Sequence, residues 1–265
     1  MIDLRQGDCL EVMKDIPDKS IDMILCDLPY GTTACKWDVI IPFEPLWEQY
    51  NRIIKDNGAI VLFGSEPFST MLRYSNLKMY KYDWVWHKNT SGGFVTAKKQ
   101  PMKYHEIISV FYKKQPTYNP QFQPYSETTN KRFKDGQMVN RTKEVEKPKN
   151  NIQGGVAFAG QQPIDKKRGK YPESVQFFNS VPNCNGTKLH PTQKPVALLE
   201  YLVNTYTNEG EIVLDNCMGS GSTGVACLRT NRKFIGIELE QKYYDVAKER
   251  IKKEMEILKL KEETF

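Results

Sequence analysis

A chain of 265 residues is long enough to bury one α/β core and to carry an inserted region as well. No apolar run approaches the roughly 20 residues that a membrane-spanning helix requires, and the N-terminus shows no signal-peptide pattern. The six cysteines form no CxxC pair and have no histidine at metal-ligand spacing. We therefore expect reduced thiols, no metal site and a cytoplasmic location.

The charge balance depends on position in the chain. Between Lys98 and Lys170 there are 16 Lys and Arg against 6 Asp and Glu, whereas the whole chain has a formal net charge of +6. A basic middle between slightly acidic flanks favours contact with a polyanion. The alternative is a solvated, partly disordered loop whose lysines only aid solubility, and composition alone leaves both interpretations open.

The first half of the chain alternates strands and helices. We expect a strand at Ile2–Arg5, a helix at Cys9–Ile16, a strand at Ile21–Cys26, a helix at Glu44–Lys55 and a strand at Ala59–Phe63. Asn57-Gly58 is predicted to stop the second helix, and the apolar run after it is typical of a strand covered on both faces. Strands at Tyr82–Trp86 and Glu106–Tyr112 follow, separated by a loop at Asn89–Gln100.

The second half returns to order after an irregular stretch. Residues 113–188 are rich in proline and polar residues, and so long an irregular segment is usually functional or disordered. We then expect a helix from Pro195 with an apolar stripe, a strand at Ile212–Leu214, a helix at Ser222–Arg229, a strand at Phe234–Ile237, and a last helix that buries Tyr244, Ala247, Ile251 and Met255. The alternation predicts an α/β fold with a doubly wound, mainly parallel sheet.

A glycine-rich turn joins the strand that ends at Asp215 to the helix that opens at Ser222. Gly219 and Gly221 let the backbone fold tightly and approach a ligand, as in turns that cradle nucleotide-like cofactors. Glu238 ends the next strand 17 residues after Gly221, and an acid at about that offset accepts hydrogen bonds from ribose hydroxyls. This spacing favours a nucleoside cofactor; the alternative is a tight strand-to-helix connection.

A second turn, Asp27-Leu28-Pro29-Tyr30, follows the strand at Ile21–Cys26. The exocyclic amine of adenine or cytosine is a poor nucleophile because its lone pair is delocalised into the ring. A carboxylate at Asp27 and the carbonyl of Leu28 or Pro29 accept the two amine hydrogens and favour the form that attacks, while Tyr30 stacks on an extruded ring. The alternative is an ordinary strand-end turn with an aspartate cap.

The order of these motifs resembles the β class of amino-methylating DNA methyltransferases, which use S-adenosylmethionine. In that class the catalytic half comes first, the cofactor half last, and target recognition lies between. Besides the two turns, the resemblance rests on Gly7-Asp8-Cys9-Leu10, Ser20-Ile21-Asp22-Met23-Ile24, Tyr82-Asp83-Trp84-Val85-Trp86-His87-Lys88, His190-Pro191-Thr192-Gln193-Lys194-Pro195 and Phe234-Ile235-Gly236-Ile237-Glu238. It implies a Rossmann-like methyltransferase fold with permuted motif order.

The resemblance also implies roles for single residues. It implies that Asp27, Pro29 and Tyr30 hold the target base, and that transfer is direct and needs no metal. It places the cofactor against Asp8 and Cys9 at its adenine, Asp215, Gly219, Gly221 and Ser222 at its methionine part, and Glu238 at its ribose, with Thr192 and Lys194 closing the site. Leu28 stands where the commonest motif has proline, and Asn216-Cys217 replaces the usual Pro-Phe.

With these flanks, the basic middle is interpreted as an inserted target-recognition region. Its Arg132, Lys134, Arg141 and Lys143 are interleaved with Phe133, Tyr125 and Asn140, a mixture suited to phosphate contact and base-edge readout. We expect residues 1–112 to form the catalytic half, 113–188 the recognition region and 189–265 the cofactor half.

The leading hypothesis is a site-specific DNA methyltransferase that acts on adenine N6 of a flipped base, since an aspartate opens the catalytic turn more often in adenine enzymes of this family. Alternatives are a cytosine-N4 enzyme, an RNA or protein-amide methyltransferase, and a DNA-binding protein that has lost transfer. The resemblance implies double-stranded DNA as partner, without a membrane, and allows a homodimer and a cognate restriction enzyme of a restriction-modification pair.

Overall fold

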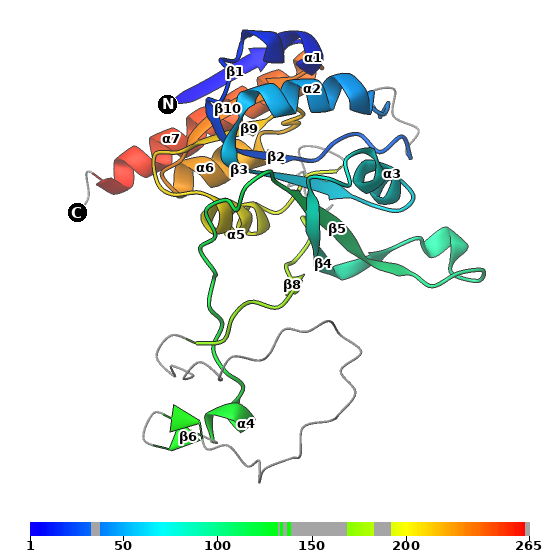
Figure 1. Ribbon diagram of the computed structural model, residues 1–265, viewed down its shortest axis with the longest axis vertical. Helices are drawn as coiled ribbons and strands as arrows, with labels where there is room; N and C mark the ends of the chain where they lie inside the picture. The colour runs from blue at the N-terminus through cyan, green and yellow to red at the C-terminus, as the bar shows by residue number, and fades with distance from the viewer. Residues whose placement is uncertain (33–37, 132, 135–136, 139–168, 183–191, 263–265) are drawn as a thin grey trace. The chain divides into compact units, whose positions relative to one another are not determined.

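The computed structural model describes residues 1–32, 38–131, 133–134, 137–138, 169–182 and 192–262 (Figure 1). The chain divides into two compact units, one formed by Met1–Asn119 with Glu173–Phe265 and a smaller one formed by Pro120–Pro172. The smaller unit is shorter than the recognition region expected from composition. Asn119 donates its side-chain amide to backbone carbonyls at the end of a helix of the larger unit, and residues 175–177 join that unit's sheet.

The larger unit is built on an eight-stranded sheet with strand order β1-β10-β9-β2-β3-β5-β4-β8. The strands are β1 (Ile2–Gln6), β2 (Ile21–Cys26), β3 (Ile54–Gly64), β4 (Tyr80–Gly92), β5 (Lys103–Phe111), β8 (Val175–Phe177), β9 (Ile212–Asp215) and β10 (Lys233–Glu238). Neighbouring strands run parallel except β5, which is antiparallel to both β3 and β4. The predicted mainly parallel α/β sheet is confirmed.

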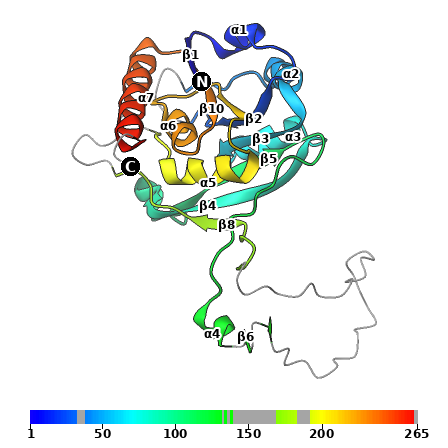
Figure 2. The ribbon, with the colours of Figure 1, turned by 90° about the vertical axis from the view of Figure 1, so that its left-hand side faces the viewer.

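Helices cover both faces of this sheet (Figure 2). One face carries α1 (Cys9–Val12), the 3₁₀ turn η1 (Met13–Asp15), α2 (Phe43–Ile53) and α3 (Phe68–Ser75); the other carries α5 (Val196–Tyr206), α6 (Ser222–Arg229) and α7 (Gln241–Glu262). A second 3₁₀ turn, η2 (Phe94–Thr96), lies between β4 and β5. In the smaller unit the structure describes α4 (Glu127–Asn130) and the paired strands β6 (Phe133–Lys134) and β7 (Gln137–Met138).

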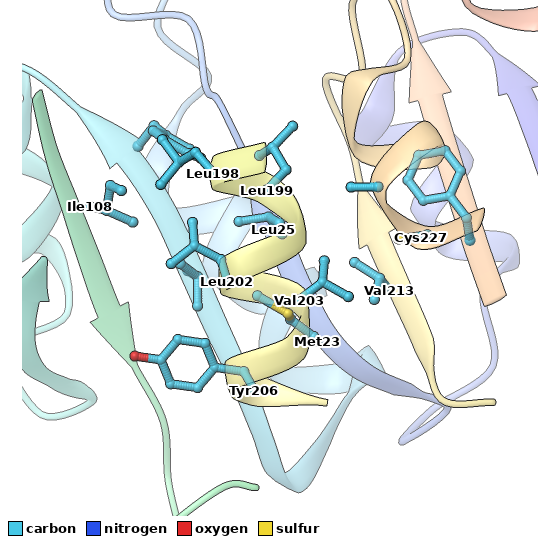
Figure 3. Close-up of a cluster of buried hydrophobic side chains, with 14 of the residues drawn as sticks. Met23, Leu25, Ile108, Leu198, Leu199, Leu202, Val203, Tyr206, Val213 and Cys227 are labelled. Atoms are coloured by element: carbon cyan, nitrogen blue, oxygen red, sulfur yellow. The ribbon is translucent and has the colours of Figure 1, made fainter. Parts of the chain in front are cut away.

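Two hydrophobic layers hold the sheet in place. Met23 and Leu25 of β2 face α5, whereas Ile24 and Cys26 face the layer of α1 and α2, as the two-residue period of a strand requires (Figure 3). All four are at most 1% exposed, so β2 is covered on both faces. This central position fixes the point at which the chain emerges from β2 into the Asp27 turn.

The expected end of the second helix was wrong, and the reason is a bulge. α2 ends at Ile53, and Ile54 already pairs with Ile21 of β2, while Ala59 pairs with Met23. Asn57-Gly58 therefore lies inside β3, where a Cβ on Gly58 would approach the Asp22 carbonyl to 2.8 Å. The Asn-Gly pair marks close approach of two strands here and not a helix stop.

Other differences are smaller. Met255 is 37% exposed, so its predicted burial in α7 was wrong, although Ala247 and Ile251 are buried as expected. β4 runs on to Gly92, which shortens the expected loop before β5. The sequence patterns predicted neither α3 nor β8. In the described residues, none of the helices combines the length and the apolar character that crossing a bilayer requires.

Candidate active site

Four acidic residues gather where parallel strands end at the same edge of the sheet. Asp8 follows β1, Asp27 follows β2, Asp215 ends β9 and Glu238 ends β10. Carboxyl ends of parallel strands at a change of strand order are where α/β proteins bind ligands. All four residues line one cavity of about 370 Å³, within the usual size range of small-molecule sites.

The glycine turn forms one wall of the cavity. Gly219 adopts a φ of 51°, and its N–H donates to Glu238 Oε2 at 2.8 Å. Glu238 Oε1 accepts from the Glu240 N–H at 3.0 Å, so two backbone amides orient this carboxylate. Glu238 is buried, which raises its pKa despite these bonds. Gly219, Ser222 and Glu238 all line the cavity, as do Asp8 and Cys9.

Gly221 has a different structural setting. It precedes α6 with a φ of 73°, and a Cβ there would lie 3.0 Å from the Cβ of Ala247 on α7. It is not among the residues that line the cavity. In this structure Gly221 lets α6 and α7 pack closely, and its predicted cofactor contact stays a prediction.

Asp215 is buried beneath the glycine turn. Its Oδ2 accepts from the Thr223 hydroxyl at 2.6 Å and its Oδ1 from the Cys217 N–H at 3.1 Å. Burial raises the pKa of Asp215 to about 7 although both hydrogen bonds favour the carboxylate. The next residue, Asn216, is 2% exposed and accepts a hydrogen bond from the Tyr50 hydroxyl at 2.6 Å. The asparagine that replaces the usual proline of the motif is thus held in place by a side chain of α2.

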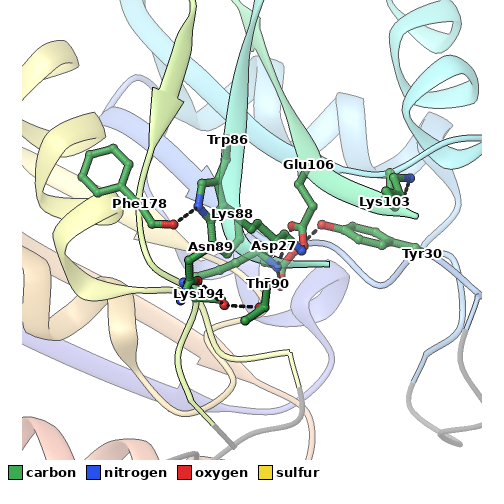
Figure 4. A network of polar contacts seen from close by, with 12 residues as sticks. Asp27, Tyr30, Trp86, Lys88, Asn89, Thr90, Lys103, Glu106, Phe178 and Lys194 are labelled. Carbon is green, nitrogen blue, oxygen red and sulfur yellow. Dashed lines mark hydrogen bonds and ion pairs between the residues drawn. The ribbon is translucent and has the colours of Figure 1, made fainter. Parts of the chain in front are cut away.

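Asp27 lies at the centre of a polar network on the opposite wall (Figure 4). The Tyr30 hydroxyl donates to Asp27 Oδ1 at 2.6 Å, and the Lys194 ammonium donates to Oδ2 at 2.5 Å. Burial raises the pKa of Asp27, against the opposing effect of Lys194, and also raises that of Tyr30, which keeps this phenol protonated as a donor. Tyr30 stacks on Phe68 of α3 with ring centroids 5.0 Å apart.

The network continues to Lys88, which ends the quoted Tyr82–Lys88 motif, and to Glu106, which no sequence motif singled out. Lys194 Nζ lies 3.4 Å from Glu106 Oε2, and Lys88 donates to Glu106 Oε1. Burial acts to raise the pKa of Glu106, but the two ammonium groups hold it below its usual value. Lys194 is 7% exposed, and although burial opposes its charge, Asp27 and Glu106 raise its pKa, so it carries its charge inside the protein.

The structure brings most of the predicted site residues together. Lining the same cavity are Asp8, Cys9, Asp27, Pro29, Tyr30, Thr192, Lys194, Asp215, Gly219, Ser222 and Glu238. Of the four predicted DNA contacts, Arg132, Arg141 and Lys143 lie outside the described residues, and Lys134 is described only as part of β6. In the described ranges, no group of three His, Cys, Asp or Glu is placed to hold a metal ion.

Comparison with known proteins gives the family. The sequence model of the N6/N4 DNA methylases matches residues 21–249. Type II methyltransferase M.HpaI of Haemophilus parainfluenzae is 30% identical over 263 residues, which cover 94% of this chain and 73% of that protein. DNA adenine methyltransferase YhdJ of Escherichia coli (strain K12) is 29% identical over 258 residues, covering 92% and 81% respectively.

Solved structures agree. The crystal structure of the M1.HpyAVI–SAM complex has a TM-score of 0.62 at 26% identity, with 95% of this chain and 99% of that chain covered. The cytosine-N4-specific PvuII DNA methyltransferase has a TM-score of 0.63 at 15% identity, over 96% and 90% of the two chains, and shows the shared fold. The chain belongs to the family of N6/N4 DNA methylases, amino methyltransferases that use S-adenosylmethionine.

Proposed function

We propose that this protein transfers a methyl group from S-adenosylmethionine to the exocyclic N6 of an adenine flipped out of duplex DNA. The observation that carries the proposal is the shared cavity. The Asp27 turn, suited to accept an amine, and the glycine turn with Glu238, suited to a nucleoside, face one space of about 370 Å³. Bound at the wall formed by the glycine turn, the cofactor would supply an electrophilic sulfonium methyl group.

The residues of the chain fit this cofactor. Glu238, held by two backbone amides, presents acceptor oxygens for the ribose hydroxyls, and Asp8 and Cys9 line the same cavity. Asp215 has its carboxyl group at the glycine turn, where it would face the positively charged methionine part of the cofactor. Thr192 and Lys194 line the cavity from the segment before α5 and would close it.

The catalytic turn would act by placement and charge. The target amine would donate one hydrogen to Asp27 and the other to the carbonyl of Leu28 or Pro29, which would leave its lone pair free to attack the methyl group. The N–C bond would form as the C–S bond of the cofactor breaks, and the methylated amine would then lose one proton. Tyr30, whose hydroxyl is bonded to Asp27, would fix the carboxylate and stack on the base. Holding reactants in line contributes on the order of 7–11 kcal/mol to such reactions.

Adenine is the proposed base for two reasons. An aspartate opens the catalytic turn, and a relative 29% identical to this chain is named a DNA adenine methyltransferase. Cytosine N4 is the runner-up, because pocket shape and not the four-residue turn separates the two bases. The homodimer and the cognate restriction enzyme of the family remain predictions.

We propose that duplex DNA contacts the basic segment between Lys98 and Lys170. Supporting this, residues 93–102 between β4 and β5 contain no acidic residue, and their Lys98 and Lys99 are exposed. Phe94 and Val95 beside them are 81% and 96% exposed. A basic surface of this kind suits the phosphate backbone, which supplies most non-specific affinity for DNA.

Nucleoside mass spectrometry tests the proposed function. Pure protein is incubated with unmethylated mixed-sequence duplex DNA and methyl-deuterated S-adenosylmethionine, with the Asp27→Ala variant as the blank. Labelled N6-methyladenine supports the proposal, and labelled N4-methylcytosine keeps the mechanism but changes the base. If the wild type binds cofactor and labels no DNA nucleoside, the proposal fails and RNA and protein substrates are tested next.

A further inference from the structure

Asp27 is already engaged before any base arrives. Tyr30 occupies Oδ1, and the Lys194 ammonium occupies Oδ2 at 2.5 Å. A carboxylate paired with an ammonium is a weaker acceptor for a neutral amine than a free one, because the lysine already neutralises its charge. If the proposed function is correct, the structure therefore shows the site in a resting state, in which Asp27 is not ready to accept the target amine.

The lysine also has the wrong charge for the reaction. During transfer, positive charge moves from the sulfonium to the attacking amine nitrogen, which donates a hydrogen bond to Asp27. An ammonium on the same carboxylate repels this developing cation, and such repulsion is strong where water is excluded. Asp27 is most useful when Lys194 has left it, but a buried ammonium that leaves one partner requires another.

A second partner lies beside the first. Glu106 is half-buried, its side chain 15% exposed, but its Oε2 is inaccessible to water and makes no hydrogen bond among the described residues, an uncommon state for a buried carboxylate oxygen. Lys194 Nζ is 3.4 Å from this oxygen. Lys88 binds the other oxygen, Oε1, and the two ammonium groups keep Glu106 ionised. Glu106 does not line the cavity, so it can accept the lysine without blocking the base.

We propose that Lys194 has two positions, one on Asp27 and one on Glu106, and that binding of the target amine to Asp27 moves the lysine to Glu106. Glu106 is thus a positioning residue that acts through Lys194 and never touches the substrate. The shift is small, since a normal charge-assisted bond of roughly 2.7–2.9 Å is only slightly shorter than the present separation. The ammonium stays paired and buried throughout, and the negative charge of Asp27 is no longer neutralised by the lysine when the amine binds.

The first test needs no methyl transfer. In protein with ¹⁵N-labelled lysine side chains, a buried paired ammonium gives a slowly exchanging NMR signal, which the Lys194→Met variant assigns. We expect Asp27→Asn and Glu106→Gln each to keep this signal at a shifted position, because the other carboxylate holds the lysine, and the double variant to lose it. Loss of the signal in either single variant overturns the two-position proposal. Near-UV circular dichroism verifies that each isosteric variant is folded.

The second test measures transfer itself. Under single-turnover conditions with mixed-sequence DNA, Glu106→Gln should slow transfer by at least about tenfold, equal to about 1.4 kcal/mol of activation free energy, with DNA and S-adenosylmethionine affinities unchanged. Glu254→Gln is the matched control, since it removes a carboxylate paired with Arg229 outside the cavity. A Glu106→Gln rate within about twofold of wild type, by the same arithmetic, overturns the proposal. A wild type without DNA transfer refutes the proposed function instead, and the NMR test still decides the lysine positions.

Discussion

The buried Asp215 carboxyl predicts that affinity for S-adenosylmethionine rises with pH. Asp215 is 3% exposed, and burial raises its pKa to about 7, so near neutrality it is only partly ionised. The cofactor has a sulfonium, an ammonium and one carboxylate, and its net positive charge favours the ionised form of Asp215. Binding should therefore release a proton from Asp215.

The magnitude follows from the pKa. With a value of about 7, the ionised fraction of Asp215 rises from roughly one-tenth at pH 6 to roughly nine-tenths at pH 8. If the ionised form alone binds, the dissociation constant falls about tenfold over this range. The sign is fixed by the direction of the shift: a carboxyl with a raised pKa is protonated at low pH, so affinity is lost as the pH falls through 7.

Isothermal titration calorimetry at pH 6, 7 and 8, in two buffers of different ionisation enthalpy, measures both the affinity and the released proton. Asp215→Asn is the control, because the Thr223 hydroxyl can still donate to the amide oxygen while the titrating group is gone. Ionisation of the cofactor's own amine affects both proteins equally. If wild type and Asp215→Asn show the same pH dependence, the reasoning from burial is refuted.

Three further predictions concern catalysis, DNA binding and stability. Asp27→Ala should lower the single-turnover rate by at least about 100-fold and leave cofactor affinity within about threefold, because the acceptor of the amine is lost; full activity would refute its catalytic role. Neutralising Arg132, Lys134 and Arg141 together should reduce the slope of log affinity against log salt by up to about 3, and an unchanged slope would move the DNA contact elsewhere. Tyr206→Phe should cost about 1–3 kcal/mol in urea unfolding because the buried Trp84 indole N–H, now donating to Tyr206 at 2.6 Å, loses its acceptor; a loss below about 0.5 kcal/mol would contradict this.

Local patterns predicted the central elements well. The apolar run of β2 and the Asp27 turn after it, and α6 at Ser222–Arg229, lie where their residue patterns place them. These elements are determined by neighbours in sequence: a period of two, a glycine at positive φ, a helix start. By contrast, Asn57-Gly58 has the composition of a stop signal, and only the approach of Asp22 on another strand makes it part of β3.

The polar network shows why part of the site was not predicted. Lys194 and Asp27 are separated by 167 positions, and Lys88 and Glu106 meet only because β4 and β5 pair in register. Glu106 looked like the polar end of an apolar strand, and its only signal was a charge beside four buried or half-buried apolar residues. A motif identifies Lys194 as part of a closing segment but not which carboxylate receives its ammonium.

Sheet order explains how the residues predicted for catalysis and for cofactor binding, which come from opposite ends of the chain, line one cavity. β2 and β9 are neighbours in the sheet, with Ile24 paired to Leu214. Asp27 follows Ile24 by 3 residues and Asp215 directly follows Leu214, so the two carboxyl groups lie at the same edge of the sheet. β10 lies next to β9 and β1 next to β10, which brings Glu238 and Asp8 to the same edge. What the cavity requires is this spatial order of strands and not their order along the chain. A chain whose predicted catalytic half precedes its predicted cofactor half can therefore form this cavity, and the connection between the two halves is free to carry an insertion.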